Sequence, residues 1–314
     1  MSIKAVLFIV SFLVILASPF AFIGPVIAAV NVVQTVVIQP DGSISPSTVP
    51  IQRNGDTYTF TGNLSATMRI HRSNIVLDGA GYTLHGPYNG TSLDVWMIGE
   101  GSNQLPEGVL AQYTIGIDLA NREVKGITIK NLNILNFSIG MYMWTNNNTV
   151  TGNAVSYNIV GILLSGSNST ITNNYISHNT QGLFFGFNDP PDIPSDIIIS
   201  HNGFESNKMQ INGCLCDEYP ENEPPHSWDN GEVGNYWSDY TGIDADNDGF
   251  GDTPYIVDIQ NQDRFPFIQN PAKPPAPSVK LSFEIVILAV VIVPTVLFVA
   301  SFVVKEKNFR RKKA

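Results

Sequence analysis

The chain has 314 residues, a net charge of −10 and 43% hydrophobic residues. Its two cysteines exclude a disulfide-rich scaffold, and its small share of lysine and arginine excludes a nucleic-acid-binding groove. Residues 305–314 hold six basic residues and one acidic residue, a charge of +5, so the rest of the chain carries −15. An acidic body of this kind favours divalent cations or high solubility.

Residues 1–29 are predicted to be a secretory signal. Lys4 precedes an apolar run, residues 5–16, and small residues including Ala28 and Ala29 follow. This is the order of regions in a signal peptide, and we expect cleavage near Ala28 or Ala29. The alternative is an uncleaved membrane anchor, because the apolar stretch continues through residues 18–33.

Residues 30–212 are predicted to form a solenoid with one long insertion. The stretch SNIVLDGAGYTLHG, residues 73–86, has the β-type residues and the Asp-Gly and Ala-Gly turn of an early coil. Residues 87–114 break the pattern that follows and are predicted to be the insertion.

The repeat is clearest in NLNILNFSIG, GNAVSYNIVG, NNYISHNTQG and HNGFESNKMQ, which begin at residues 131, 152, 173 and 201. Two asparagine ladders run through these stretches, with steps of 21 or 22 residues and a final step of 28, where a Pro-rich loop is inserted. The first ladder is Asn131, Asn153, Asn174 and Asn202, and the second is Asn136, Asn158, Asn179 and Asn207. A glycine column consists of Gly140, Gly161 and Gly182, followed by Gln210.

A period of roughly 20–25 residues with short strands indicates a solenoid, because one such unit cannot bury its own apolar face. Asparagine tolerates the left-handed backbone of a turn and can hydrogen-bond the asparagine of the next coil. The repeat therefore predicts an all-β, single-stranded parallel β-helix. The leucine frame of a leucine-rich repeat is absent from the sequence.

Residues 213–268 are predicted to cap the solenoid. A cap is needed because the last coil exposes both its core and its strand edges. The aromatic residues of this stretch are expected to seal that end, and the alternative is a platform for glycan contact. The candidate glycan contacts are Trp228, Tyr236, Trp237 and Tyr240, with Tyr255 in the same cluster.

The cap contains an acidic loop that matches a calcium-binding pattern. Asp244, Asp246, Asp248 and Asp252 stand at positions 1, 3, 5 and 9 of an EF-hand-type loop, with Gly249 at position 6 and the carbonyl of Phe250 at position 7. Position 12 is Tyr255, so Asp258 or Asp263 would have to replace the usual glutamate. The alternative is a solvated acidic turn. Four carboxylates so close together repel one another, and we therefore expect a structural Ca²⁺ ion.

The chain is predicted to end in a membrane anchor. Residues 269–280 form a Pro-rich linker, and residues 281–304 contain an uncharged run long enough to cross the ~30 Å hydrocarbon core. The basic tail, residues 305–314, is expected on the cytoplasmic side. The sequence therefore predicts a single-pass cell-surface protein whose folded part lies outside.

Two stretches resemble a known family. SNIVLDGAGYTLHG and the coils after it resemble the NosD-like, carbohydrate-binding-and-hydrolase type of right-handed parallel β-helix. Residues 228–258 resemble the cap of many archaeal surface proteins. The family name implies a periplasmic copper-binding role linked to nitrous oxide reductase maturation. For copper, the soft-metal candidates are Cys214, Cys216 and His226. For Met141 and Met143 the alternatives are soft metal ligands and core residues.

Catalysis is not expected on the coils. Residues 131–188 contain no Asp, Glu, Lys or Arg, so they offer no carboxylate pair and no Lys or Arg base. Charged residues near the insertion are expected to be solvated; they are Asp94, Glu100, Glu107, Asp118, Arg122 and Glu123. No catalytic residue is assigned.

The sequence predicts a membrane-anchored extracellular β-helix that binds surface glycans or envelope proteins. The alternatives are a NosD-like copper-binding or metal-delivery protein and a carbohydrate-active enzyme on the same fold. The glycosylation candidates are the sequons at Asn63, Asn89, Asn136, Asn147 and Asn168.

Overall fold

The computed structural model describes residues 34–88, 114–186, 194–213 and 226–273. The predicted signal (1–29), nearly all of the insertion (87–114), Cys214, Cys216, the linker from residue 274, the membrane segment (281–304) and the basic tail lie outside the described residues. Within the described ranges, no helix is both long enough and apolar enough to span a membrane.

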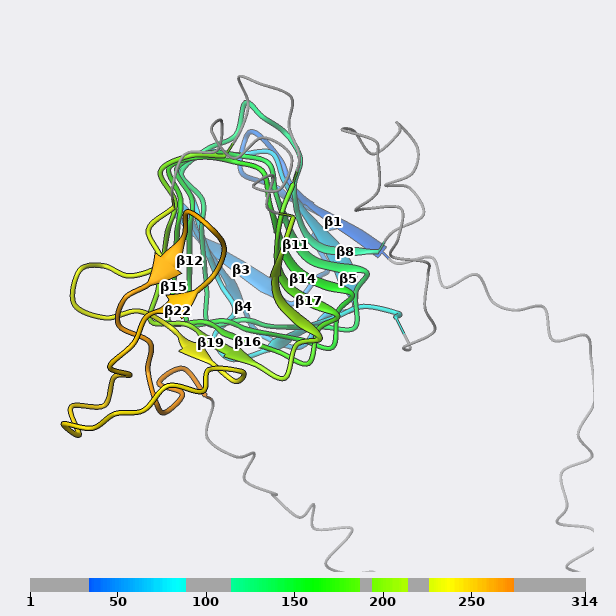
Figure 1. The fold of residues 1–314 in the computed structure, drawn as a ribbon. Coiled ribbons are helices and arrows are strands. Elements are labelled where there is room, and N and C mark those ends of the chain that lie inside the picture. The colour runs from blue at the N-terminus through cyan, green and yellow to red at the C-terminus, as the bar shows by residue number, and fades with distance from the viewer. Residues whose placement is uncertain (1–33, 89–113, 187–193, 214–225, 274–314) are drawn as a thin grey trace, which may run out of the picture. The chain divides into compact units, whose positions relative to one another are not determined.

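The described residues form three sheets of stacked strands (Figure 1). Sheet 1 has the order β2-β1-β5-β8-β11-β14-β17-β20, sheet 2 has the order β18-β15-β12-β9-β6-β4-β3, and sheet 3 has the order β21-β19-β16-β13-β10-β7. Neighbouring strands are parallel except for the pairs β1–β2 and β3–β4. A short antiparallel pair, β22 (Tyr255–Ile256) and β23 (Gln262–Asp263), lies outside these sheets.

From β5 to β19, each coil contributes one strand to each sheet, and β2 and β3 are antiparallel edge strands. Sheet 1 contains β1 (Gln34–Ile38), β2 (Ile44–Ser45), β5 (Ala66–Ile70), β8 (Ile115–Leu119), β11 (Ile139–Met143), β14 (Val160–Leu164), β17 (Gln181–Phe185) and β20 (Met209–Asn212). Sheet 2 contains β3 (Ile51–Asn54), β4 (Thr57–Phe60), β6 (Val76–Asp78), β9 (Thr128–Lys130), β12 (Thr149–Thr151), β15 (Thr170–Thr172) and β18 (Ile198–Ser200). Sheet 3 contains β7 (Thr83–His85), β10 (Asn133–Leu135), β13 (Ala154–Ser156), β16 (Tyr175–Ser177), β19 (Gly203–Glu205) and β21 (Tyr236–Trp237).

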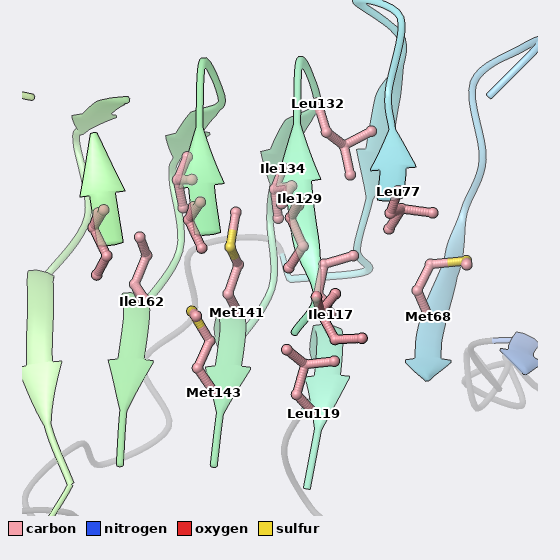
Figure 2. Packing of buried hydrophobic residues seen from close by; sticks show 14 of the residues in the cluster. Met68, Leu77, Ile117, Leu119, Ile129, Leu132, Ile134, Met141, Met143 and Ile162 are labelled. Atoms are coloured by element: carbon pink, nitrogen blue, oxygen red, sulfur yellow. The ribbon is translucent and has the colours of Figure 1, made fainter. Parts of the chain in front are cut away.

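The core lies between the three sheets. In the short strands of sheets 2 and 3, the central residue points inward and its two neighbours point outward, which is the alternation of a pleated strand. Ile129, Val150 and Ile171 are thus stacked partners on successive coils, each fully buried. Met141 and Met143 are also fully buried and point into this core (Figure 2).

The two asparagine ladders exist, but each begins one coil later than predicted. Asn153, Asn174 and Asn202 are buried, and each accepts the main-chain N–H of the ladder residue before it at 3.0 Å. The second ladder contains Asn158, Asn179 and Asn207. These side chains satisfy the main-chain N–H groups at the corners, which strand pairing leaves unbonded.

Asn131 and Asn136 are not ladder members. Leu132 and Phe137 occupy the ladder positions of that coil, while Asn131 and Asn136 precede them at φ +53° and +63°. The corner therefore has two adjacent positions that favour asparagine, one left-handed and outward, the other inward and hydrogen-bonded. The prediction assigned Asn131 and Asn136 to the ladder positions, which Leu132 and Phe137 occupy one residue later in the chain.

The glycine column is confirmed, and Gly116 extends it by one coil. A Cβ on Gly161 would lie 2.5 Å from the carbonyl oxygen of Gly182, and Gly116, Gly140 and Gly182 each meet the next coil in the same way. Each of these glycines is the second residue of a strand of sheet 1, where the coils approach too closely for a side chain between them.

Candidate functional site

The C-terminal segment, residues 226–273, continues sheet 3 beyond the last repeat. β21 pairs in parallel with β19, and Asn235, directly before β21, extends the first ladder by accepting the N–H of Asn202 at 3.0 Å. The next ladder position is taken by Asp263, whose side chain is fully buried. Its Oδ2 accepts the N–H of Asn235 at 2.6 Å, so the ladder of amides ends on a carboxyl group.

Asp263 also binds the aromatic centre of the C-terminal segment. Its Oδ2 accepts the indole N–H of Trp237 at 2.8 Å, and its Oδ1 accepts the N–H of Phe265 at 3.0 Å. Burial raises the pKa of Asp263 to about 6, although these N–H donors lower it. Asp229 adds a weaker upward contribution.

Trp237 lies between two rings. It stacks on Phe204 with ring centres 4.6 Å apart and on Tyr255 with ring centres 4.2 Å apart. Trp237 is 1% exposed. Because Phe204 belongs to β19 of the last repeat and Tyr255 to β22, this stack joins the C-terminal segment to the coil core.

The acidic loop brings three of its four aspartates together. One carboxylate oxygen from each of Asp244, Asp246 and Asp248 lies within 4.8 Å of the others, and Asp246 and Asp248 are exposed. The loop wraps around the Asp244 carboxylate, which accepts the N–H of Asp248 at 3.1 Å and of Gly249 at 3.0 Å. Gly249 has φ +96°, which suits the sharp turn at position 6.

Asp252 and the replacements for position 12 have other partners. The Asp252 carboxylate accepts the N–H of Ala245 at 2.9 Å. Asp263 is committed to the ladder, and Asp258 accepts the N–H groups of Gln260 and Asn261 at 2.8 Å. The described loop therefore offers three convergent carboxylates, and the remaining oxygen ligands of a Ca²⁺ ion would be main-chain carbonyls and water.

The acidic loop is fastened to the rest of the C-terminal segment. The N–H of Gly251 donates to the carbonyl of Pro266 at 2.8 Å, and the N–H of Ile268 donates to the carbonyl of Gly249 at 3.1 Å. The hydroxyl of Tyr240 donates to the carbonyl of Thr253 at 2.5 Å. The loop is thus positioned by bonds on both sides.

A second feature lies on the coils and was missed by the sequence reasoning. Tyr157 and His178 follow β13 and β16 at the same corner of successive coils, and their rings stack with centres 5.1 Å apart. Tyr157 is 55% exposed, and both residues have positive φ angles, +57° and +55°. The available signal was a tyrosine and a histidine at a repeat position where asparagine or glycine is usual.

Two of the described charged residues near the insertion are engaged in contacts, while Glu123 is exposed, as expected. Asp118 is buried and accepts the Nε–H of Arg69 at 2.9 Å. Arg122 lies over the ring of Trp144 at 4.3 Å from its centre. Asp118 and Arg122 were both expected to be solvated, and this prediction is wrong for Asp118. Asp94, Glu100 and Glu107 lie outside the described residues.

The family described as "Right handed beta helix region" matches residues 98–222. The stacked parallel sheets over the same part of the chain agree with this match. The match covers less than half of the chain, and the stacked parallel strands of the described residues are consistent with a right-handed β-helix. No curated protein matches the chain. The predicted β-helix is therefore confirmed, whereas the narrower NosD-like type stays a resemblance.

Two of the four candidate glycan contacts on the β-helix protein are not available to a ligand. Trp228 and Trp237 are each 1% exposed, so neither ring presents a face to the solvent. Tyr236 and Tyr240 are half-buried. The buried rings pack against the coil core, which was the favoured expectation for the cluster.

The described copper candidates are all buried. Met141 and Met143 fill the β-helix core. His226 is buried against the ring of Phe185, with centres 4.6 Å apart, and burial lowers its pKa to about 4. Cys214 and Cys216 lie outside the described residues.

The sequons differ in access. Asn63, Asn147 and Asn168 are exposed, while Asn136 is half-buried with its Nδ2 at 2.9 Å from Nε2 of His85. Asn89 lies outside the described residues.

Proposed function

We propose that this chain is an extracellular β-helix protein that binds surface glycans or envelope proteins and does not cleave them. Residues 281–304 would anchor it in the membrane, with the basic tail in the cytoplasm. The C-terminal segment would cap the β-helix, and a Ca²⁺ ion in the acidic loop would hold that cap in place.

The observation that carries the binding role is the chemistry of the coil surface. Residues 131–188 contain no charged side chain, and the positions that flank the central residue of β12, β13, β15 and β16 hold threonine and serine, together with Ala154 and Tyr175. Cleavage of a polysaccharide requires a general acid and a base or nucleophile, usually carboxylates. Hydroxyl, amide and aromatic groups instead provide hydrogen bonds and stacking without acid–base chemistry.

The calcium role is supported by the convergence of Asp244, Asp246 and Asp248 within 4.8 Å. Ca²⁺ prefers oxygen ligands at about 2.3–2.6 Å, and three carboxylates at this separation can reach one such ion after small side-chain rotations. The ion would offset the mutual repulsion of these carboxylates. Main-chain hydrogen bonds with Pro266 and Ile268 already hold the other side of the loop, so the ion would fix the loop on both sides.

Binding and cleavage are separated by one assay. The full chain in detergent is incubated with a panel of immobilised polysaccharides, and both retained protein and released sugar are measured. Retention on a polysaccharide without released reducing ends or unsaturated sugars is the expected result. Released products would instead show a carbohydrate-active enzyme. Bound copper in the same sample, at one ion per chain after dialysis, would favour the metal-delivery alternative.

A further inference from the structure

Some residues at the corners of the β-helix have positive φ angles that their side chains disfavour. At the corner before sheet 2, the left-handed positions are filled by Asn74, Gly126, Asn147, Asn168 and Asp196. These are the residue types that adopt positive φ at little cost. The corner after sheet 3 instead holds Asn136, Tyr157, His178 and Ser206 on successive coils, and we name these four residues the corner ridge.

Tyr157 is the outlier of the corner ridge. A bulky aromatic residue at φ +57° is strained, because its Cβ lies close to the following carbonyl. Burial does not offset the strain, since the side chain is 55% exposed. Strained residues that persist on a surface point to function.

The two rings of the corner ridge form one exposed stack. The planes of Tyr157 and His178 are inclined by 26°, with centres 5.1 Å apart, which follows the spacing of parallel strands. The ridge continues to Asn136, whose amide is bonded to His85, and to the exposed Ser206. Over three coil steps of ~4.8 Å its length is about 14 Å.

The surroundings of the ridge are polar but almost uncharged. Ser156 and Ser177 directly precede the two rings, and Glu205, before Ser206, accepts the side-chain N–H of Asn270 at 3.0 Å. Bases of nucleic acids also stack on aromatic rings, but their phosphates need several lysine or arginine residues. Residues 131–188 contain none, and Lys208 lies two positions after Ser206. A ligand with an apolar face, hydroxyl groups and no charge fits this chemistry.

We propose that the corner ridge is a binding site for a neutral oligosaccharide, with Tyr157 and His178 contacting the apolar face of its sugar rings through their edges and the ring faces that the stack leaves free, and with Asn136 and Ser206 flanking the stack. The site rests on the proposed glycan-binding function and gives it a location on the coils. At its end, the N–H of Ser206 donates to Oγ of Ser238 in the C-terminal segment at 3.0 Å. The occupant of the site would lie along the axis of the coils.

The decisive variants are Tyr157→Asn and His178→Asn. Asparagine suits the left-handed corner, so both variants are expected to keep or raise the melting temperature while losing the stack. His201→Asn is the matched control, because it makes the same change at a left-handed corner position (φ +60°) outside the ridge. Tyr157→Phe keeps the ring and tests whether the stack alone suffices.

The probes are cellohexaose, mannohexaose and xylohexaose, with oligogalacturonate as the charged comparison. The full chain comes from a host without N-glycosylation, so that the sequon at Asn136 carries no sugar. We expect wild type, His201→Asn and Tyr157→Phe to bind a neutral probe, and each asparagine variant at Tyr157 or His178 to bind it about tenfold more weakly or worse, as for loss of an aromatic contact.

The outcomes separate the site from the function. Wild-type binding that is unchanged in Tyr157→Asn and His178→Asn overturns the corner ridge and leaves glycan binding elsewhere on the chain. A lower melting temperature in both asparagine variants shows that the rings serve stability, which also overturns the site. Absence of binding to any glycan by the wild type removes the proposed glycan-binding function itself.

Discussion

Asp263 Oδ2 lies 2.6 Å from the main-chain nitrogen of Asn235, in the position that an asparagine of a further coil would occupy. The ladder Asn153, Asn174, Asn202, Asn235 therefore runs out of the repeat and into the C-terminal segment. A contact between residues 28 positions apart thus makes the segment a continuation of the β-helix.

Replacing Asp263 tests this continuation. Asp263→Ala leaves the N–H groups of Asn235, Trp237 and Phe265 buried without an acceptor, and each such loss costs about 1–3 kcal/mol. Asp263→Asn retains one carbonyl oxygen and should lose less. We expect chemical denaturation, followed by tryptophan fluorescence, to rank the stabilities wild type or Asp263→Asn above Asp263→Ala. Equal stability of all three would mean that the ladder does not depend on residue 263.

The same residue predicts a pH dependence. Burial raises the pKa of Asp263 from 3.8 to about 6, so the folded protein takes up a proton that the unfolded chain binds only at lower pH. The contribution of Asp263 to stability should therefore increase as pH falls from 7 to 4 and decrease as pH rises through 6. The full effect is about 3 kcal/mol for this shift. His226 acts in the opposite direction, because burial lowers its pKa from 6.5 to about 4, so its contribution to stability decreases as pH falls over that range.

Asp263→Asn is the control for the pH effect, because an amide does not titrate. The difference between wild type and Asp263→Asn should change with pH between 4 and 7. Asp229 acts in the opposite direction: Arg264 lowers its pKa, so its contribution is present above pH 3.8 and is lost in stronger acid. A difference that stays constant from pH 4 to 7 would contradict a neutral Asp263.

Calcium should stabilise the folded protein. An ion that binds only the folded state at 100 times its Kd adds about 2.7 kcal/mol, which raises the melting temperature by a few degrees. The double variant Asp246→Ala, Asp248→Ala should remove that shift, while Glu232→Ala, an exposed acidic residue of the same segment, should keep it. No shift with millimolar Ca²⁺ in the wild type would leave an acidic turn without an ion.

The glycine column predicts a large effect from one methyl group. In Gly161→Ala, the new Cβ would lie 2.5 Å from the carbonyl oxygen of Gly182, so the coils must separate. We expect a loss of about 3 kcal/mol or more, at the upper end of overpacking. Gly55→Asn is the control, since Gly55 has φ +61° and no atom within 4 Å of its Cβ position. Similar melting temperatures for both variants would argue against close coils.

The coil repeat could be predicted because asparagine and glycine recur with the period of the fold. The exact ladder register could not, because the left-handed corner position and the inward ladder position both favour asparagine. Asn173 and Asn174 show this directly, since they are adjacent and occupy one position each. Only the packing of Leu132 into the core shows that Asn131 lies outside the ladder.

The candidate sites were predicted unevenly for a similar reason. The spacing of Asp244, Asp246 and Asp248 is local, and the structure brings these three together. The role of Asp263 depends on a contact across the C-terminal segment, so no local pattern reveals it. Tyr157 and His178 were missed because they interrupt the asparagine pattern at the corner, and the interruption itself is the signal.

Hydrogen exchange most directly tests whether the C-terminal segment closes the β-helix with calcium. The N–H of Asn235 donates to Asp263, and the N–H of Phe267 donates to the carbonyl of Asn235. In the presence of Ca²⁺, both N–H groups should exchange as slowly as those of β14 and β17. Removal of calcium should accelerate exchange in residues 244–252 before the coils are affected. Fast exchange at Asn235 and Phe267 with and without calcium, while the N–H groups of the coils stay protected, would contradict a closed end of the β-helix.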